Sequence, residues 1–464
     1  MISKSLAIKV LNVGLSTGAD FAEIYLEETN TTSIDMDNGE VKTINSGISY
    51  GAGIRLLKQF QSVYGYTNDI SPKGLTKLAS SLAASFSSER IKTVEKIEKV
   101  RVKKHHRSLT PLCDVSKERK IELMKEAYEA CSSYSPLIVR TQVLFSDNTK
   151  KVTIFNSEQK EFHDERGRGR IYITALASKD GKIETSGVGP GAQKGLEFFT
   201  DDIQIKEIAK ETAKTALVML DADECPSGKM TVVIGNGFGG VIFHEACGHG
   251  LEASAVSKNL SVFSNKLGQK IASDIVTAVD DGTIENGWGS GNIDDEGNPT
   301  QRNVLIENGI LKSYLVDSFH GRRMNIPGNG ATRRESYQYE PTSRMSNTFI
   351  CNGKSTPEEI IKATEHGLYA KSLGGGSVNP TTGDFNFAVT EGYLIENGEI
   401  TKPVKGTTLI GNGADILLQI DMVGNDLERA QGMCGAASGS IPADVGQPTI
   451  RVKEITVGGR GGAQ

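Results

Sequence analysis

The chain alternates between segments with apolar residues three or four positions apart and segments in which apolar and polar residues take turns. The first spacing is typical of amphipathic helices, and the second of half-buried strands. The helical spacing predicts helices over 5–15, 72–86, 116–132, 203–219, 241–256, 355–366 and 426–432. The alternating pattern predicts strands over 33–36, 41–44, 137–145, 152–156 and 171–178, and the dipeptide Asn38-Gly39 predicts a hairpin between the first two.

The pattern divides the chain into three parts, which agrees with its 464 residues and a usual domain size of about 150 residues. In the parts 1–92 and 93–225 we expect two N-terminal α+β units, joined by a solvated charged linker over 93–111. The part 226–464 is rich in glycine and in turn dipeptides such as Asp281-Gly282. There we expect a mostly antiparallel β domain with a few embedded helices, so the predicted fold class is α+β.

Composition excludes several classes of protein. The chain is 37% hydrophobic and 23% charged, as is usual for a folded protein, and its net charge of −5 lacks the basic excess of nucleic-acid or anionic-membrane binders. The six cysteines are scattered without a C-x-x-C pair, which favours a reducing compartment. We expect no signal peptide, because Lys4 and Lys9 interrupt the first apolar run, and no apolar run is long enough to span a membrane. We therefore expect a cytoplasmic protein with no nucleic-acid or membrane partner.

A glycine-rich loop over 235–240 follows a predicted strand over 230–234. Its glycines match the G-x-G-x-x-G pattern of dinucleotide sites, which also requires an acidic residue about 20 residues further on. The segment 257–262 contains no acidic residue. We therefore expect these glycines to serve close backbone packing or to leave room for a ligand.

The strongest chemical signal follows this loop, where His244, Glu245 and His249 form an H-E-x-x-x-H pattern. Two imidazoles can bind a metal ion, and the carboxylate beside the first can activate a metal-bound water. On a regular α-helix, positions five apart point about 140° away from each other. A π-helical turn returns both imidazoles to one side, and Gly248 makes such a distortion easy. We therefore predict a local irregularity over 246–249.

A catalytic zinc site needs a third protein ligand as well as an open position. Cys434 lies among small residues over 432–439, which permit close approach to an ion, and a buried structural cysteine is the alternative interpretation. We expect Cys247 to point away from the two histidines. His320 is expected in a surface or loop role, and His366 at a helix end as a capping residue.

Three segments in the last part of the chain carry a family resemblance: HEACGHGLEA, GGGSVNPTTGDFNFAVTEGYLIENGEI and GMCGAASG. With them the chain resembles the TldD half of the TldD/PmbA (TldD/TldE) peptidases over almost its whole length. The resemblance implies an HExxxH metallopeptidase that uses zinc, with iron as the alternative, and acts on unfolded or short flexible peptides. It implies that His244 and His249 bind the metal, with Glu245 as the catalytic base. It further implies that Cys434 is the third ligand, and that the partner is a TldE/PmbA-like subunit or a second copy.

The mode of peptide binding is open to hypothesis from the sequence. An extended peptide that adds as a strand to a sheet edge would bind through its main-chain hydrogen bonds, with little specificity for its side chains. The polar segments 333–337 and 344–347 leave two alternatives, a movable wall of the site and an ordinary solvated loop.

Two other classes of function stay open. One is a non-catalytic metal-binding modulator or partner subunit that acts on another protein or peptide, a class to which descriptions of this family as gyrase modulators belong. The other is a metal oxidoreductase, because two histidines and a cysteine can also hold iron. Glu245 beside His244 favours water activation and therefore a hydrolase.

Overall fold

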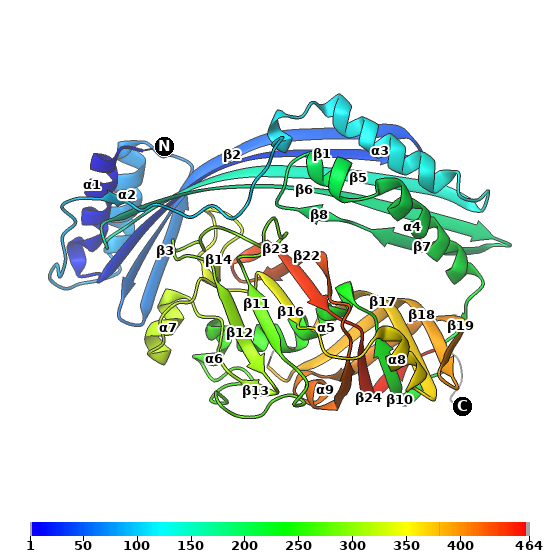
Figure 1. Ribbon diagram of the computed structural model, residues 1–464. Coiled ribbons are helices and arrows are strands. Elements are labelled where there is room, and N and C mark those ends of the chain that lie inside the picture. The colour runs from blue at the N-terminus through cyan, green and yellow to red at the C-terminus, as the bar shows by residue number, and fades with distance from the viewer. Residues whose placement is uncertain (1, 380, 461–464) are drawn as a thin grey trace.

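The computed structural model describes residues 2–379 and 381–460. Pro380, within the second of the three resemblance segments, and the last four residues of the predicted third part lie outside this description. A long curved sheet, which we call the arch, extends over a second block formed by the glycine-rich part of the chain (Figure 1). The combination of helices with mostly antiparallel sheets confirms the predicted α+β class.

The arch consists of long strands in the order β3-β2-β1-β5-β6-β4, with β7 and β8 also paired to β6. Asn38 and Gly39, with φ of 49° and 79°, form the predicted hairpin turn between β1 and β2. The strand bounds are β1 (Phe21–Asp37), β2 (Glu40–Lys58), β3 (Gln61–Thr67), β4 (Glu98–Lys99), β5 (Ile138–Asn156), β6 (Lys160–Lys179), β7 (Lys182–Val188) and β8 (Gly191–Ala192).

One strand replaces two predicted ones. The predicted strands 137–145 and 152–156 are both parts of β5, which continues through the polar residues between them. That polar stretch resembles a turn in composition, but Asp147 is buried and accepts a hydrogen bond of 2.8 Å from Lys120 on the helix above it. The ion pair allows a polar stretch to remain inside a covered strand.

Helices cover the arch on its outer face and at its N-terminal end (Figure 1). All four helices predicted before residue 226 are present, with bounds shifted by a few residues. Apolar side chains of α1 and α2 pack in one core with β1 and β2, whereas those of α3 and α4 pack in another with β5 and β6. The bounds are α1 (Lys4–Gly14), α2 (Pro72–Ala83), α3 (Lys117–Ser132) and α4 (Ile205–Leu220).

The two N-terminal units share one sheet, because β1 pairs with β5 from Glu23 opposite Asn156 to Asp37 opposite Gln142. The division at residues 92 and 225 stays a prediction. Within the described residues, no helix is long and apolar enough to cross a membrane.

The second block contains two larger sheets with the largest apolar core between them. The first has the order β17-β10-β24-β20-β18-β19-β9, with β21 added to β24, and the second has the order β13-β12-β11-β16-β23-β22. Their bounds are β9 (Asp223–Glu224), β10 (Gly228–Ile234), β11 (Ala278–Asp281), β12 (Arg302–Glu307), β13 (Ile310–Leu311), β16 (Asn347–Ile350), β17 (His366–Val378), β18 (Asp384–Glu396), β19 (Glu399–Lys405), β20 (Thr407–Asn412), β21 (Ile420–Val423), β22 (Glu428–Ala436), β23 (Gly439–Gln447) and β24 (Ile450–Gly458).

Short elements connect these sheets. The helix predicted over 241–256 is divided into short helical pieces by the extended backbone at Glu252, and the helix predicted over 426–432 is wrong. The segment 426–432 enters β22, where all nine residues pair with β23, so strand pairing overrides a local preference for helix. The predicted helix over 355–366 is shorter, and Thr356 caps its start. The remaining bounds are α5 (Val241–Phe243), α6 (Ala253–Val256), α7 (Ser318–Met324), α8 (Pro357–Lys362), α9 (Gly413–Gln419), β14 (Thr332–Arg333) and β15 (Thr342–Ser343).

Buried ion pairs join the arch to the second block. Arg55 on β2 reaches Glu23 at 3.1 Å and Glu296 at 2.6 Å, and all three side chains are almost completely buried. Arg334 reaches Glu23 at 2.6 Å from the second block. Arg166 on β6 makes a further bridge to the second block, at 2.7 Å from Asp295 (Oδ1). The arch is therefore held by charges that lose their partners if the two blocks separate.

We predict that Arg55→Met lowers the free energy of unfolding by about 3–5 kcal/mol, because Glu23 and Glu296 stay buried with one cationic partner fewer. Denaturant unfolding followed by circular dichroism measures this change. Lys229→Met, which removes an exposed ion pair with Glu454, is the matched control and is expected to have little effect. Equal loss of stability in both variants would show that the buried pairs do not hold the blocks together.

Candidate metal centre

The candidate site begins where β10 leaves its sheet. The strand ends in buried residues, and the glycine loop turns the chain beneath β23. A Cβ atom on Gly240 would lie 2.4 Å from the backbone of Gly446 in β23, a contact that a larger residue cannot make. Gly240 therefore serves close backbone packing, which is one of the two roles expected for this loop. The contact places the end of the loop next to β23.

The predicted irregularity is present. His244–Gly248 is a π-helical turn, and the N–H of His249 donates to the carbonyl of His244 five residues earlier. The two imidazoles consequently lie on the same side, with ring centroids 5.3 Å apart. Gly248 has an ordinary helical φ of −56°, so its role is one of space: a Cβ there would lie 2.2 Å from Sδ of Met345.

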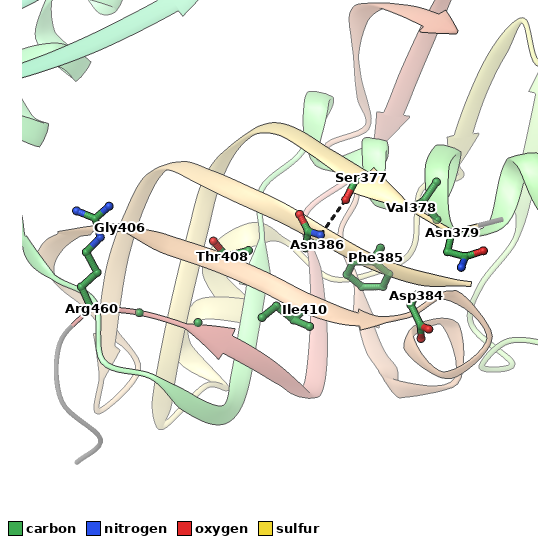
Figure 2. Close-up of a pocket in the computed structure, with 12 residues that line it drawn as sticks. Ser377, Val378, Asn379, Asp384, Phe385, Asn386, Gly406, Thr408, Ile410 and Arg460 are labelled. Atoms are coloured by element: carbon green, nitrogen blue, oxygen red, sulfur yellow. Dashed lines mark hydrogen bonds between the residues drawn. The ribbon is translucent and has the colours of Figure 1, made fainter. Parts of the chain in front are cut away.

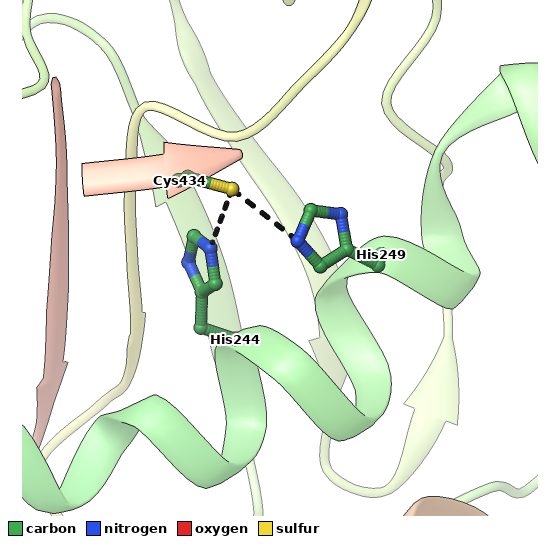
Figure 3. Close-up of side chains that lie close together, drawn as sticks. All are labelled: His244, His249 and Cys434. Atoms are coloured by element: carbon green, nitrogen blue, oxygen red, sulfur yellow. Dashed lines mark hydrogen bonds between the residues drawn. The ribbon is translucent and has the colours of Figure 1, made fainter. Parts of the chain in front are cut away.

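Cys434, on β22, faces both imidazoles (Figure 3). Its Sγ lies 3.1 Å from Nε2 of His244 and 3.3 Å from Nε2 of His249. In a tetrahedral site, bond lengths of about 2.0 Å to nitrogen and about 2.3 Å to sulfur place such donor atoms roughly 3.5 Å apart. The geometry and the N₂S donor set therefore fit a metal ion of the zinc or ferrous-iron type.

The charges around Cys434 favour the form that binds metals. Burial alone would raise the pKa of this thiol, but the two neighbouring imidazoles outweigh it and lower the pKa to about 3. Burial likewise opposes protonation of His249, but the carboxylate of Glu252 and the sulfur of Cys434 raise its pKa well above the ordinary value. The lowered pKa favours the thiolate of Cys434, which is the form that binds metals.

Two carboxylates next to His249 lie on opposite sides of its ring. Oε2 of Glu245 is 3.7 Å from Nε2, on the side of Cys434, and the Glu245 side chain is 30% exposed. Oε1 of Glu252 is 3.0 Å from Nδ1, on the far side, and is buried. Glu252 was not predicted from the sequence, although a metal-binding histidine usually donates its second nitrogen to a carboxylate or carbonyl. A carboxylate three residues after the second histidine was the available signal.

The other sequence-predicted positions lie outside this cluster. Cys247 points away as expected, with Sγ 3.5 Å from the carbonyl of Gly413. The surface role expected for His320 is wrong: it is buried in α7, with Nδ1 2.7 Å from Oδ2 of Asp317. The capping role expected for His366 is also wrong, because this residue begins β17.

The polar segment 344–347 is neither a movable wall nor a solvated loop. Arg344 and Asn347 are completely buried, and Asn347 begins β16 at the centre of its sheet. The segment 333–337 is mixed, with Arg334 buried in the ion pairs that hold the arch. Polar composition indicated exposure, but ion pairs and hydrogen bonds satisfy these side chains inside the protein.

The resemblance segment around β17 and β18 lines a separate pocket (Figure 2). Ser377, Asp384 and Asn386 lie along it, and Asn386 donates to Ser377 over 2.8 Å. The pocket shares no residue with the metal cluster, but its hairpin supports the cluster indirectly. Gly383 accepts from the N–H of Gly413, and a Cβ on Gly413 would lie 2.1 Å from the carbonyl oxygen of Ala246 in the π-helical turn.

Comparison with known sequences gives matches along the whole chain. Models described as PmbA/TldA metallopeptidase domain 1, central domain and C-terminal domain match residues 22–86, 110–220 and 227–459. A metalloprotease TldD homolog of Buchnera aphidicola is 36% identical over 453 residues, covering 95% of this chain and 93% of the relative. The homolog of Haemophilus influenzae is 35% identical over 466 residues, covering 99% and 97%. A zinc metalloprotease TldD homolog of Saccharolobus solfataricus is 25% identical, covering 95% and 97%.

Solved structures share the fold. A Thermotoga maritima protein whose name refers to modulation of a DNA gyrase has a TM-score of 0.81 at 22% identity, covering 98% of this chain and 99% of that one. TldE from Thermococcus kodakarensis has a TM-score of 0.77 at 18% identity, covering 97% and 99%. Together with the family models and the closely similar TldD homologs, these matches identify the chain as a member of the TldD/PmbA metallopeptidase family.

Proposed function

We propose that this protein is a zinc-dependent peptidase that hydrolyses unfolded or short flexible peptides, with His244, His249 and Cys434 as the metal ligands. The observation that carries the proposal is the convergence of three donor atoms, all within 4.8 Å of one another, beside a partly exposed carboxylate. When bound, the metal supplies a Lewis acid that polarises the scissile carbonyl and makes a water molecule more acidic.

Glu245 is the proposed general base. Its carboxylate lies on the side of His249 that faces Cys434, and it is open enough to meet water. Among the described residues, no lysine or arginine nitrogen lies within 4.0 Å of this carboxylate. Glu245 is therefore free to accept a proton from the attacking water and to pass it to the leaving amine.

The edge of β22 is the proposed docking site for the peptide main chain. β22 is the last strand of its sheet, and Asp444, opposite Gln431, donates its N–H to Ser346 on the other side of β23. Gln431 consequently points its own polar backbone atoms away from β23, where its carbonyl accepts from Arg170 of the arch. Alternate residues of a strand share this direction, so Met433 presents its N–H and carbonyl at the edge beside Cys434.

A partner subunit, either TldE-like or a second copy, belongs to the proposal. Residues 40–50 of β2 are exposed along the free edge of the arch, and Ile48 has 70% of its surface exposed. A long edge strand with exposed apolar side chains is typical of an association surface. A partner strand that pairs with residues 40–50 would contact the arch and not the metal cluster, which lies in the second block.

The ligand assignment predicts the behaviour of bound Co²⁺, which replaces zinc in sites with nitrogen and sulfur donors. Titration of the metal-free protein should give a sulfur-to-cobalt charge-transfer band, and Cys434→Ser should abolish this band and weaken binding. Cys247→Ser is the matched control, because this thiol is also buried on the neighbouring turn but faces Gly413. A band that survives in Cys434→Ser, or that disappears in Cys247→Ser, would contradict the assignment.

The base assignment predicts that Glu245→Gln loses about 10²–10⁴-fold in peptide hydrolysis but keeps its metal, because an amide cannot accept the proton. The assay incubates an unstructured peptide mixture with the zinc-loaded protein and reads cleavage by mass spectrometry.

Asp415→Asn, a carboxylate change on α9, serves as the control for the assay and should retain activity. If the wild-type chain cleaves only after a TldE-like protein is added, the peptidase depends on its partner. Equal cleavage by the wild type and Glu245→Gln would exclude Glu245 as the base.

Docking by strand addition predicts a dependence on the peptide backbone. N-methylation of alternate amides next to the cleaved bond should raise KM more than tenfold. Each methyl group removes one main-chain hydrogen bond, worth at most about 1.5 kcal/mol, and also keeps the peptide from approaching the strand closely. Substitution of the same side chains by alanine should have a smaller effect. The opposite order of effects would show that side chains, and not the main chain, are recognised.

A further inference from the structure

A completely buried arginine lies directly behind Cys434. Arg344 donates from Nη2 to the carbonyl of Cys434 over 2.5 Å. From Nη1 it donates to the hydroxyl of Ser438 and to the carbonyl of Gly439, both over 2.9 Å. One guanidinium thus contacts β22, the turn after it and the start of β23, and fixes the hairpin at the level of the candidate third ligand.

The same guanidinium faces the carboxylate behind His249. Nε of Arg344 lies 3.9 Å from Oε1 of Glu252, which is a charge contact rather than a hydrogen bond. This oxygen is the one 3.0 Å from Nδ1 of His249. Among the described residues, Arg344 is the only arginine or lysine with a nitrogen within 4.0 Å of Glu252. Besides the imidazole of His249, Arg344 therefore supplies the positive charge next to this buried carboxylate.

We propose that Arg344 and Glu252 are positioning residues that hold two of the three metal ligands in place. Glu252 keeps the proton of His249 on Nδ1, so that the lone pair of Nε2 faces Cys434 and the metal position. Arg344 fixes Glu252 by charge and the backbone of Cys434 by hydrogen bonding. This inference rests on the proposed metal site and on no step of peptide hydrolysis.

The shape of the arginine head group is part of the argument. A guanidinium is a planar fork with several fixed donors, and here it serves three acceptors in two directions while its remaining edge faces a carboxylate. Lysine offers the same charge at a single point and cannot span these acceptors. Arg344→Lys should therefore keep part of the positive charge next to Glu252 but lose most of the hydrogen bonds to the β22–β23 hairpin.

His244 provides an internal contrast. Its Nδ1 is buried and has no hydrogen-bond partner within the described part of the chain. Packing of the π-helical turn is therefore what holds this ligand, whereas the other two share the Arg344–Glu252 support. Loss of that support should disturb the bonds to Cys434 and His249 while the first ligand stays in place.

The test uses the full-length protein in its metal-free form, loaded with Co²⁺, and compares wild type with Arg344→Met, Arg344→Lys and Glu252→Gln. We expect Arg344→Met and Glu252→Gln to raise the Co²⁺ dissociation constant by about 10–100-fold. We also expect a shift of the sulfur-to-cobalt band, with a smaller change of both quantities in Arg344→Lys. Circular dichroism of each metal-free variant establishes that it is folded at the temperature of the titration.

Arg55→Met is the matched control, because Arg55 is as completely buried as Arg344 and is also ion-paired, but to Glu23 and Glu296. It should lower stability without changing the Co²⁺ dissociation constant or spectrum. Wild-type affinity and spectrum in folded Arg344→Met and Glu252→Gln would overturn the proposal. An equal loss of affinity in Arg55→Met would overturn it too, since the effect would then be one of general stability.

If Arg344→Met does not fold, Glu252→Gln decides the outcome alone. A wild-type protein that binds no Co²⁺ would overturn the metal site and this inference together. A protein that binds Co²⁺ as described but cleaves no peptide would support this inference and contradict only the peptidase. The two proposals can therefore fail separately.

Discussion

The candidate centre depends on one constraint, which is that two histidines five positions apart must face the same point. A regular helix cannot satisfy it, and the π-helical turn over His244–Gly248 does so by adding one residue to a single turn. The turn has room only because the neighbouring backbone approaches closely, at Gly240 below β23 and at Gly248 beside Met345. Close packing of small residues is therefore a precondition of the chemistry proposed for this site.

Burial of charge is the second theme of the structure. Charged side chains lie inside the protein both where the arch meets the second block, as at Arg55, and behind the candidate ligands, as at Arg344. Each has a partner of opposite charge or several backbone acceptors, which is the condition under which buried charge is tolerated. Such contacts have a fixed geometry. They therefore suit a protein in which β22 holds Cys434 at a set distance from the histidines of the π-helical turn.

Much of this arrangement could be predicted from the sequence. Periodic apolar positions identified the N-terminal helices, Asn38-Gly39 identified a hairpin, and the spacing of His244 and His249 required an irregular turn. These signals are local, since each depends on residues within a few positions of one another. The family resemblance then selected Cys434, which the spacing alone had left open against a structural role.

What could not be predicted depends on residues far apart in the chain. The segment 426–432 forms a strand because β23 pairs with it, and the polar centre of β5 stays in the sheet because Lys120 covers Asp147. Arg344 looked like a surface residue, since its acceptors lie about 90 positions away on β22 and β23. A polar residue carries no sign in the sequence of whether water or the protein will satisfy it.

The shared sheet of the arch limits how this chain can vary. Since β1 and β5 stay in one register over their paired length, inserting a single residue into either would turn every later side chain to the opposite face. The first unit therefore shares the hydrogen bonds of its sheet with the second, even though its sequence matches a model of its own. A change in the length of β1 must be matched by a change on β5, so the two strands are constrained to vary together.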